Sequence, residues 1–234
     1  MGGARNSVVR ALHRLVAKGD LATPQRGFYV AVPPEYRSLG CLPGEQFIPQ
    51  LLERADEPYH VTLLSAAQLH GAAHQRPQSL QVMLKRPRPP IECGKVRIDF
   101  YVRRDLERAG IVTMNTPRGL VRVASPETTA LELVGYESQA GGLDAVATVL
   151  RELAEKLDPE ILVQEAVKLP LAWAQRLGFL LDLAASGGIT GPLQQYVREH
   201  ARRVAPLDPS ASRTGAGRSR PWKIAINADI EVDF

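Results

Sequence analysis

The stretch at residues 125–133, SPETTALEL, separates a part of the chain whose pattern predicts strands from a part whose pattern predicts helices. Ser125 can cap a helix, Pro126 suits the first helical position, and Glu127 places an acid in the first turn, so a helix is expected to about Glu137. Short apolar runs between proline and glycine predict strands before this stretch, at 80–85, 96–103, 111–115 and 120–123.

Helical periodicity dominates after the stretch and predicts helices at 143–157, from Asp158-Pro159, at 171–185 and at 192–203. Two further helices are expected earlier, near 47–54 and 62–74. The segment 205–220, poor in apolar residues, predicts a mobile loop, and a last strand is expected at 222–228. This order of elements predicts an α+β fold with a small sheet and a helical C-terminal half.

The first forty residues have a pattern of their own. Apolar residues recur at helical spacing over 6–18, with Asn6 or Ser7 as the expected cap and Gly19 as the expected end. Residues 21–32 then predict a β-hairpin with Arg26 at its tip. A basic helix followed by a hairpin is therefore expected at the N-terminus.

The charge of the chain is uneven. Hydrophobic residues make up 44% and charged residues 23% of the 234 residues, which is typical of a globular protein. The net charge is +4, and residues 1–40, with six basic and two acidic side chains, account for all of it. A basic segment beside a neutral remainder is the charge pattern expected of a phosphate-binding module.

Several classes of protein are not indicated. No apolar run reaches the roughly 20 residues that span a bilayer, and the N-terminus lacks the apolar core of a signal peptide, so a cytoplasmic protein without a membrane partner is expected. Cys41 and Cys93 lie far apart and in no CxxC spacing, which argues against a disulfide framework and a zinc site. Each is expected to be a small buried or half-buried residue.

Three motifs in order resemble the AbiEi family of antitoxins: 63–74 (LLSAAQLHGAAH), 125–133 and 141–146 (GGLDAV), with 222–234 similar to the end of that family. The resemblance implies a partial winged helix-turn-helix at 1–40, followed by a mixed α/β antitoxin domain at 41–234. It also implies a bacterial type IV toxin-antitoxin operon, in which the protein counteracts a nucleotidyltransferase toxin and represses its own transcription.

The chain departs from the family at its start. The stretch 7–18 resembles the recognition helix and 21–32 the wing, but the roughly two helices expected before the recognition helix are absent. Either translation starts further upstream, or the chain has lost specific DNA binding.

The resemblance assigns DNA contacts to the N-terminal module. Arginine and asparagine suit bidentate contacts to guanine and adenine, whereas a side chain on a wing suits phosphate. The alternative is a solvated basic helix face. The predicted DNA-binding residues are Arg5, Asn6, Arg10, His13, Arg14 and Arg26.

Two other site types are weaker candidates. His70 and His74 have the four-residue spacing of a metal pair, but no glutamate follows His70, so packing is the favoured role and no metal is predicted. A metal-dependent nuclease site could be built from Glu92, Lys95 and Asp99, but the spacing of these residues does not match that of such sites. Charged side chains at the edge of a strand are the simpler explanation. No catalytic residue or cofactor is predicted, and a DNA-binding regulator without antitoxin activity is the other alternative.

Overall fold

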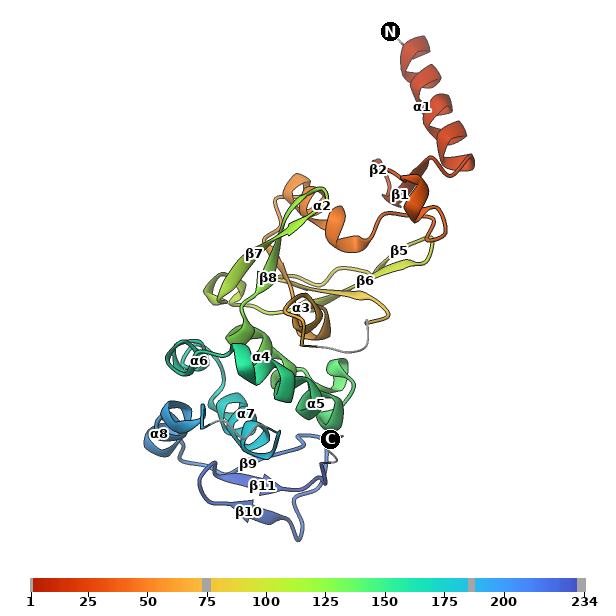
Figure 1. Ribbon diagram of the computed structural model, residues 1–234. Coiled ribbons are helices and arrows are strands. Elements are labelled where there is room, and N and C mark those ends of the chain that lie inside the picture. The colour runs from red at the N-terminus through yellow and green to blue at the C-terminus, as the bar shows by residue number, and fades with distance from the viewer. Residues whose placement is uncertain (1, 73–76, 185–187, 231–234) are drawn as a thin grey trace. The chain divides into compact units, whose positions relative to one another are not determined.

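The computed structural model describes residues 2–72, 77–184 and 188–230, with the backbone alone for residues 2–5. Its fold is α+β, as the sequence predicts, with most strands before Ser125 and most helices after it (Figure 1). Two compact units emerge. Unit 1 comprises Met1–Val61, Gln78–Leu106 and Thr113–Arg122, and unit 2 comprises Thr62–Pro77, Glu107–Val112 and Val123–Phe234. The functional division at residue 40 stays a prediction.

The N-terminal helix and hairpin of unit 1 form as expected, apart from the start of the helix. Helix α1 spans Gly2–Ala17 and so begins before Asn6 and Ser7, which lie inside it rather than at its cap. The amide of Asp20 donates to the carbonyl of Leu15 at 3.0 Å across Gly19, whose φ of +74° closes the helix. Strands β1 (Leu21–Gln25) and β2 (Phe28–Ala31) then pair antiparallel.

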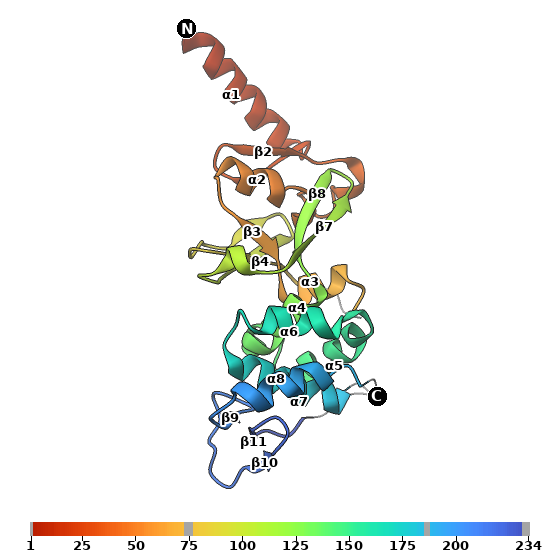
Figure 2. The same ribbon diagram turned by 90° about the vertical axis from the view of Figure 1, so that its left-hand side faces the viewer.

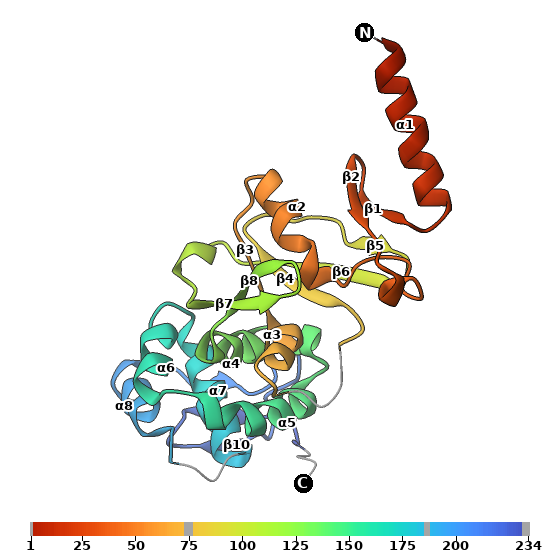
Figure 3. The ribbon, with the colours of Figure 1, turned by 45° about the horizontal axis from the view of Figure 1, so that its top comes forward.

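A six-stranded sheet lies in unit 1 apart from residues 111–112 of β7 and 123–124 of β8, in the order β5-β6-β4-β3-β8-β7, with β4 and β6 parallel (Figure 3). The three-residue strands β3 and β5 were not expected, because they are too short to show alternation. Helix α2 (Ile48–Arg54) buries Ile48 and Leu52. The strands are β3 (Tyr59–Val61), β4 (Leu80–Leu84), β5 (Ile91–Cys93), β6 (Val96–Val102), β7 (Ile111–Thr116) and β8 (Gly119–Ala124).

Helices dominate unit 2 (Figure 2). The predicted caps are confirmed: the hydroxyl of Ser125 accepts the amide of Thr128 at 3.2 Å, and the carboxylate of Asp158 accepts the amides of Glu160 and Ile161. Helix α7 packs on α4, α5 and α8. The helices are α3 (Leu63–Leu69), α4 (Pro126–Gly135), α5 (Leu143–Leu153), α6 (Pro159–Ala166), α7 (Leu171–Ala184) and α8 (Gly191–His200).

Three of these helices end several residues earlier than predicted, and one of them is α8, which ends at His200 rather than at residue 203. Helix α3 ends at Leu69 rather than continuing to residue 74, because Gly71 adopts a φ of +70°. Helix α5 ends at Leu153, and a single 3₁₀ turn, Ala154–Lys156, follows it.

The prediction of a loop at 205–220 is confirmed for 207–216, which form neither helix nor strand, and is wrong near the two ends of the segment. Strands β9 (Ala205–Pro206) and β10 (Gly217–Ser219) join β11 (Ile224–Ile226) in a three-stranded sheet. The side chain of Asn227 fixes the intervening segment: its Oδ1 accepts the amide of Asp208 at 3.0 Å, and its Nδ2 donates to the carbonyls of Asp208 and Ala211. Because Asn227 is distant in sequence, local composition gives no sign of these bonds.

Candidate nucleic-acid interface

One face of α1 carries exposed polar and basic side chains. Asn6, Arg10, His13 and Arg14 are all exposed, and spacings of three and four residues place them on the same side of the helix. Apolar Val8 on the opposite side is 59% exposed. The structure therefore brings together four of the six predicted DNA-binding residues.

The charges on this face are not neutralised within the described residues. Arg10, Arg14 and Arg26 have no carboxylate partner there, whereas Arg37 pairs with Asp20 at 2.7 Å. An unpaired arginine remains available for phosphate or the edge of a base. The backbone of Arg5 lies in α1, but its side chain lies outside the described residues.

Arg26 lies at the tip of the hairpin, as predicted, in a turn closed by Gly27 with a φ of +76°. Two arginines that the sequence analysis did not single out hold this turn. Arg54 of α2 donates to the carbonyl of Gly27 at 2.9 Å, and Arg88 donates to the side chains of both Gln25 and Glu57. No local motif marks these positioning residues, because each acts over a long separation in sequence.

Of the histidines at 70 and 74, the structure describes His70, which directly follows α3. His70 Nε2 donates to the carbonyl of Ala124 at 2.7 Å, and since a carbonyl oxygen only accepts, Nε2 carries the hydrogen. His74 lies outside the described residues, in which no group of three or more metal-ligating side chains occurs. His70 therefore has the packing and hydrogen-bonding role that the sequence analysis favours.

Protonation of His70 should destabilise the fold. Burial lowers the pKa of His70 from 6.5, and the charge of Lys156 adds to that effect. The stability that depends on neutral His70 is thus present above pH 6.5 and is lost as the pH falls through the lower folded-state pKa, by about 1.4 kcal/mol for each unit of pKa difference. Urea unfolding at several pH values should show this loss, with a flatter profile in His70→Gln; equal slopes would contradict it.

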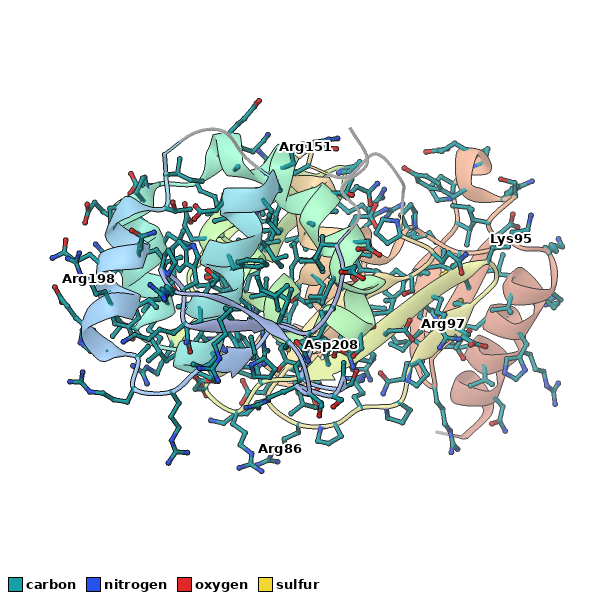
Figure 4. All side chains as sticks on the ribbon, turned by 90° about the horizontal axis from the view of Figure 1, so that it is seen from below. Arg86, Lys95, Arg97, Arg151, Arg198 and Asp208 are labelled. Atoms are coloured by element: carbon teal, nitrogen blue, oxygen red, sulfur yellow. The ribbon has the colours of Figure 1, made fainter. Side chains whose placement is uncertain are left out.

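The two carboxylates of the nuclease alternative, Glu92 and Asp99, form ion pairs with Arg97. Arg97 contacts Glu92 at 2.7 Å and Asp99 at 2.9 Å. Partial burial acts to raise the pKa of Asp99, but the Arg97 guanidinium and the Ser79 hydroxyl outweigh it, so this pKa lies below its ordinary value. Figure 4 shows Arg97 and Lys95 among the side chains of this region. Carboxylates already neutralised by arginine are poor metal ligands, which counts against a nuclease here.

Unit 2 contains a buried polar cluster built on the motif at 125–133. The Ser125 hydroxyl donates to Glu127 at 2.9 Å, and the other oxygen of Glu127 accepts the amide of Asp158. Glu165 of α6 accepts from Gly110, Thr128 and Lys168. Each of these buried carboxylates thus has hydrogen-bond donors, as burial requires.

A second buried carboxylate lies on α4. Glu132 is fully buried, and the hydroxyl of Thr62 donates to it at 2.5 Å. The sequence analysis did not single out Thr62, Glu132 or Glu165. The available signal was the placement of acidic residues among apolar ones in α4 and α6, where a carboxylate needs buried partners. Thr62 directly precedes the motif at 63–74 and Glu132 lies within the motif at 125–133, so this bond links the two segments inside unit 2.

In the described part of the chain, every helix is too short or too polar to cross a membrane.

Comparisons with known proteins agree with these features. The sequence profile described as the AbiEi antitoxin C-terminal domain matches residues 60–183, more than half of the chain. No curated protein matches the sequence of this chain.

Two solved structures align with this chain, and one of them shares its fold. The RV2827C protein of Mycobacterium tuberculosis aligns over 94% of this chain and 78% of its own, with 19% identity and a TM-score of 0.63, which shows a similar fold. An antigenic nucleotidyltransferase-like protein of Paracoccidioides brasiliensis aligns over 67% of this chain and 86% of its own, with 13% identity. Its TM-score of 0.36 is too low to indicate a shared fold. On the profile match, the chain belongs to the AbiEi antitoxin family.

Proposed function

We propose that this protein is the antitoxin of a bacterial type IV toxin-antitoxin pair, and that it also represses its own operon through its N-terminal module. Its functional partner is a co-encoded nucleotidyltransferase toxin, and its second partner is operator DNA. Both activities belong in the cytoplasm, where toxin target and operator are found.

Family membership carries the antitoxin part of the proposal. The matched segment 60–183 includes α3 to α7 and the buried polar cluster around Ser125, Glu127 and Glu165. We expect this cluster to hold the antitoxin unit together rather than to perform chemistry, because its carboxylates are buried and hydrogen-bonded.

The exposed face of α1 carries the DNA-binding part. Arg10 and Arg14 are unpaired within the described residues and share a face with Asn6 and His13. Arg26 adds a fourth positive or titratable group at the tip of a hairpin that Arg54 and Arg88 hold in place. A helix with a basic face and a braced basic hairpin is an arrangement suited to a groove and the adjacent phosphates.

Operator binding should depend on Arg10 and Arg14. We expect Arg10→Ala/Arg14→Ala to bind DNA from its own promoter roughly 100-fold more weakly, since a good contact to a base contributes about 1–3 kcal/mol. The affinity of the wild-type chain should fall steeply as salt rises, and the slope against log[salt] should be shallower in the variant. Fluorescence anisotropy over a salt series measures both quantities.

Arg198→Ala/Arg202→Ala is the matched control, because it also removes two arginine charges from exposed positions in unit 2. The side chain of Arg198, on α8, points away from the ribbon (Figure 4). The affinity of this control variant should equal that of the wild type. Absence of binding at low salt would refute the DNA-binding part of the proposal, and an equal loss in both variants would place the interface elsewhere.

A further inference from the structure

The two cysteines are remote in sequence but adjacent in the fold of unit 1. Cys41 follows the hairpin by one short connection, and Cys93 ends β5. Both are free and buried, with Cys41 fully enclosed and Cys93 9% exposed. The sequence analysis argued against a disulfide framework because of their separation, which says nothing about their distance in space.

The chain segments that carry the cysteines touch through their backbones. The amide of Lys95 donates to the carbonyl of Leu39 at 2.7 Å. A Cβ atom on Gly94 would lie only 2.1 Å from that same carbonyl oxygen and 2.9 Å from the Cα of Gly40. Glycine is thus required at position 94 for this approach, which brings the chain next to Cys41 close to the chain next to Cys93.

The thiols interact with each other and with the hairpin. A hydrogen bond from one thiol to the other raises the pKa of Cys41 and lowers that of Cys93, and the backbone of Thr23 in β1 also favours the Cys93 thiolate. Of the two, Cys93 therefore has the larger fraction of thiolate, and it is also the less enclosed, at 9% exposed against 0% for Cys41.

We propose that Cys41 and Cys93 are an oxidation site at which a peroxide converts the two thiols into a reversible intramolecular disulfide. The inference stands independently of the antitoxin and repressor functions. Because the backbones at Leu39–Gly40 and Gly94–Lys95 are in contact, the adjoining cysteines need only a local shift to reach the S–S bond length of about 2.05 Å. In a reducing compartment such a pair is a thiol pair until an oxidant arrives.

The chemistry proceeds in two balanced steps. The Cys93 thiolate attacks one oxygen of hydrogen peroxide, the O–O bond breaks, and a sulfenic acid and one water form once the hydroxide takes up a proton. The Cys41 sulfur then attacks the Cys93 sulfur, the S–O bond breaks, and the second water leaves with the thiol proton of Cys41. In total, two thiols lose two electrons and two protons to the peroxide, which is reduced to two waters.

The disulfide would tie the connection after the hairpin to the strand on which the hairpin rests. Strand β1 packs on β5, and the backbone of Thr23 contacts the sulfur of Cys93. A bond across this junction closes a long loop of the unfolded chain and restricts its freedom. Oxidation should therefore raise the melting temperature of the full chain and slow amide exchange in β1 and β5.

The test treats the full-length reduced protein with hydrogen peroxide and follows it by intact mass and by the count of free thiols. We expect a loss of two hydrogen masses, disappearance of both thiols, a monomeric product and full reversal by dithiothreitol. The same oxidation in concentrated urea should be at least roughly tenfold slower, because unfolding separates the two thiols. Two thiols that both stay free, products that are only dimers, or equal rates in both states would overturn the proposal.

Single variants distinguish the cysteine that attacks the peroxide from the cysteine that then forms the disulfide. In Cys41→Ser, the sulfenic acid on Cys93 should accumulate and be trapped by dimedone, because no second thiol resolves it. In Cys93→Ser, Cys41 should stay reduced over the same time, since it is enclosed. Equal dimedone labelling of the two variants would contradict the assignment of Cys93 as the attacking thiol, and the wild-type mass measurement tests the disulfide even if a variant folds poorly.

Discussion

Gly178→Ala is expected to lower the melting temperature by about 6–12 °C, since a loss of roughly 3 kcal/mol shifts a domain of this size by that amount. Gly178 lies in α7, where an added Cβ would sit 2.1–2.4 Å from ring carbons of Trp222. Trp222 is 1% exposed, and its indole nitrogen donates to Asp182 at 2.6 Å, so the ring has no room to move. Thermal unfolding measured by circular dichroism checks the shift.

Gly191→Ala is the matched control for this substitution. Gly191 begins α8, has no atom within 4 Å of an added Cβ, and does not have a positive φ. Alanine is the better helix former, so the melting temperature should stay the same or rise slightly. Equal changes in melting temperature for the two substitutions would contradict the close packing of α7 against Trp222.

Glu165→Ala is expected to destabilise the protein by about 3 kcal/mol, because it leaves several donors near the protein interior without their acceptor. Glu165 is 6% exposed and accepts from the amide of Gly110 at 3.1 Å, the hydroxyl of Thr128 at 3.3 Å and the ammonium of Lys168 at 2.5 Å. Urea unfolding should show a lower midpoint, and Glu165→Gln should recover part of the loss.

Gln164→Ala controls for this change, since Gln164 is the exposed neighbour of Glu165 on the same helix. Its unfolding midpoint should match that of the wild type within about 0.5 kcal/mol. If Glu165→Ala is equally mild, the buried polar cluster does not stabilise unit 2.

Local signals in the sequence predict much of this fold. Ser125 and Asp158 act as caps because each sits directly before a proline and an apolar helical pattern, and Gly19 closes α1 for the same local reason. The strands at the ends of segment 205–220 were not predicted, and Asn227 orders the loop between them through bonds to residues distant in sequence. Strand β5 was not predicted, because three residues cannot show a period.

The candidate interface also combines features that local sequence predicts with features that depend on tertiary contacts. Helical spacing is enough to place Arg10, His13 and Arg14 on one face of α1, and the exposure of all three agrees with that placement. Their contact with DNA remains a prediction. The braces on the hairpin, Arg54 and Arg88, and the juxtaposed cysteines depend on tertiary contacts, so no pattern along the chain reveals them.

The most direct test of the central claim is survival of cells that express the co-encoded toxin. Toxin and antitoxin should each be placed under a foreign promoter, so that repression of the natural operon does not contribute to the result. Full-length protein is expected to restore colony counts to the level of cells without toxin, and Arg10→Ala/Arg14→Ala should restore them equally, because the proposal assigns neutralisation to the domain after residue 40. Colony counts as low with the protein as with an empty vector, at matched toxin levels, would contradict the antitoxin function.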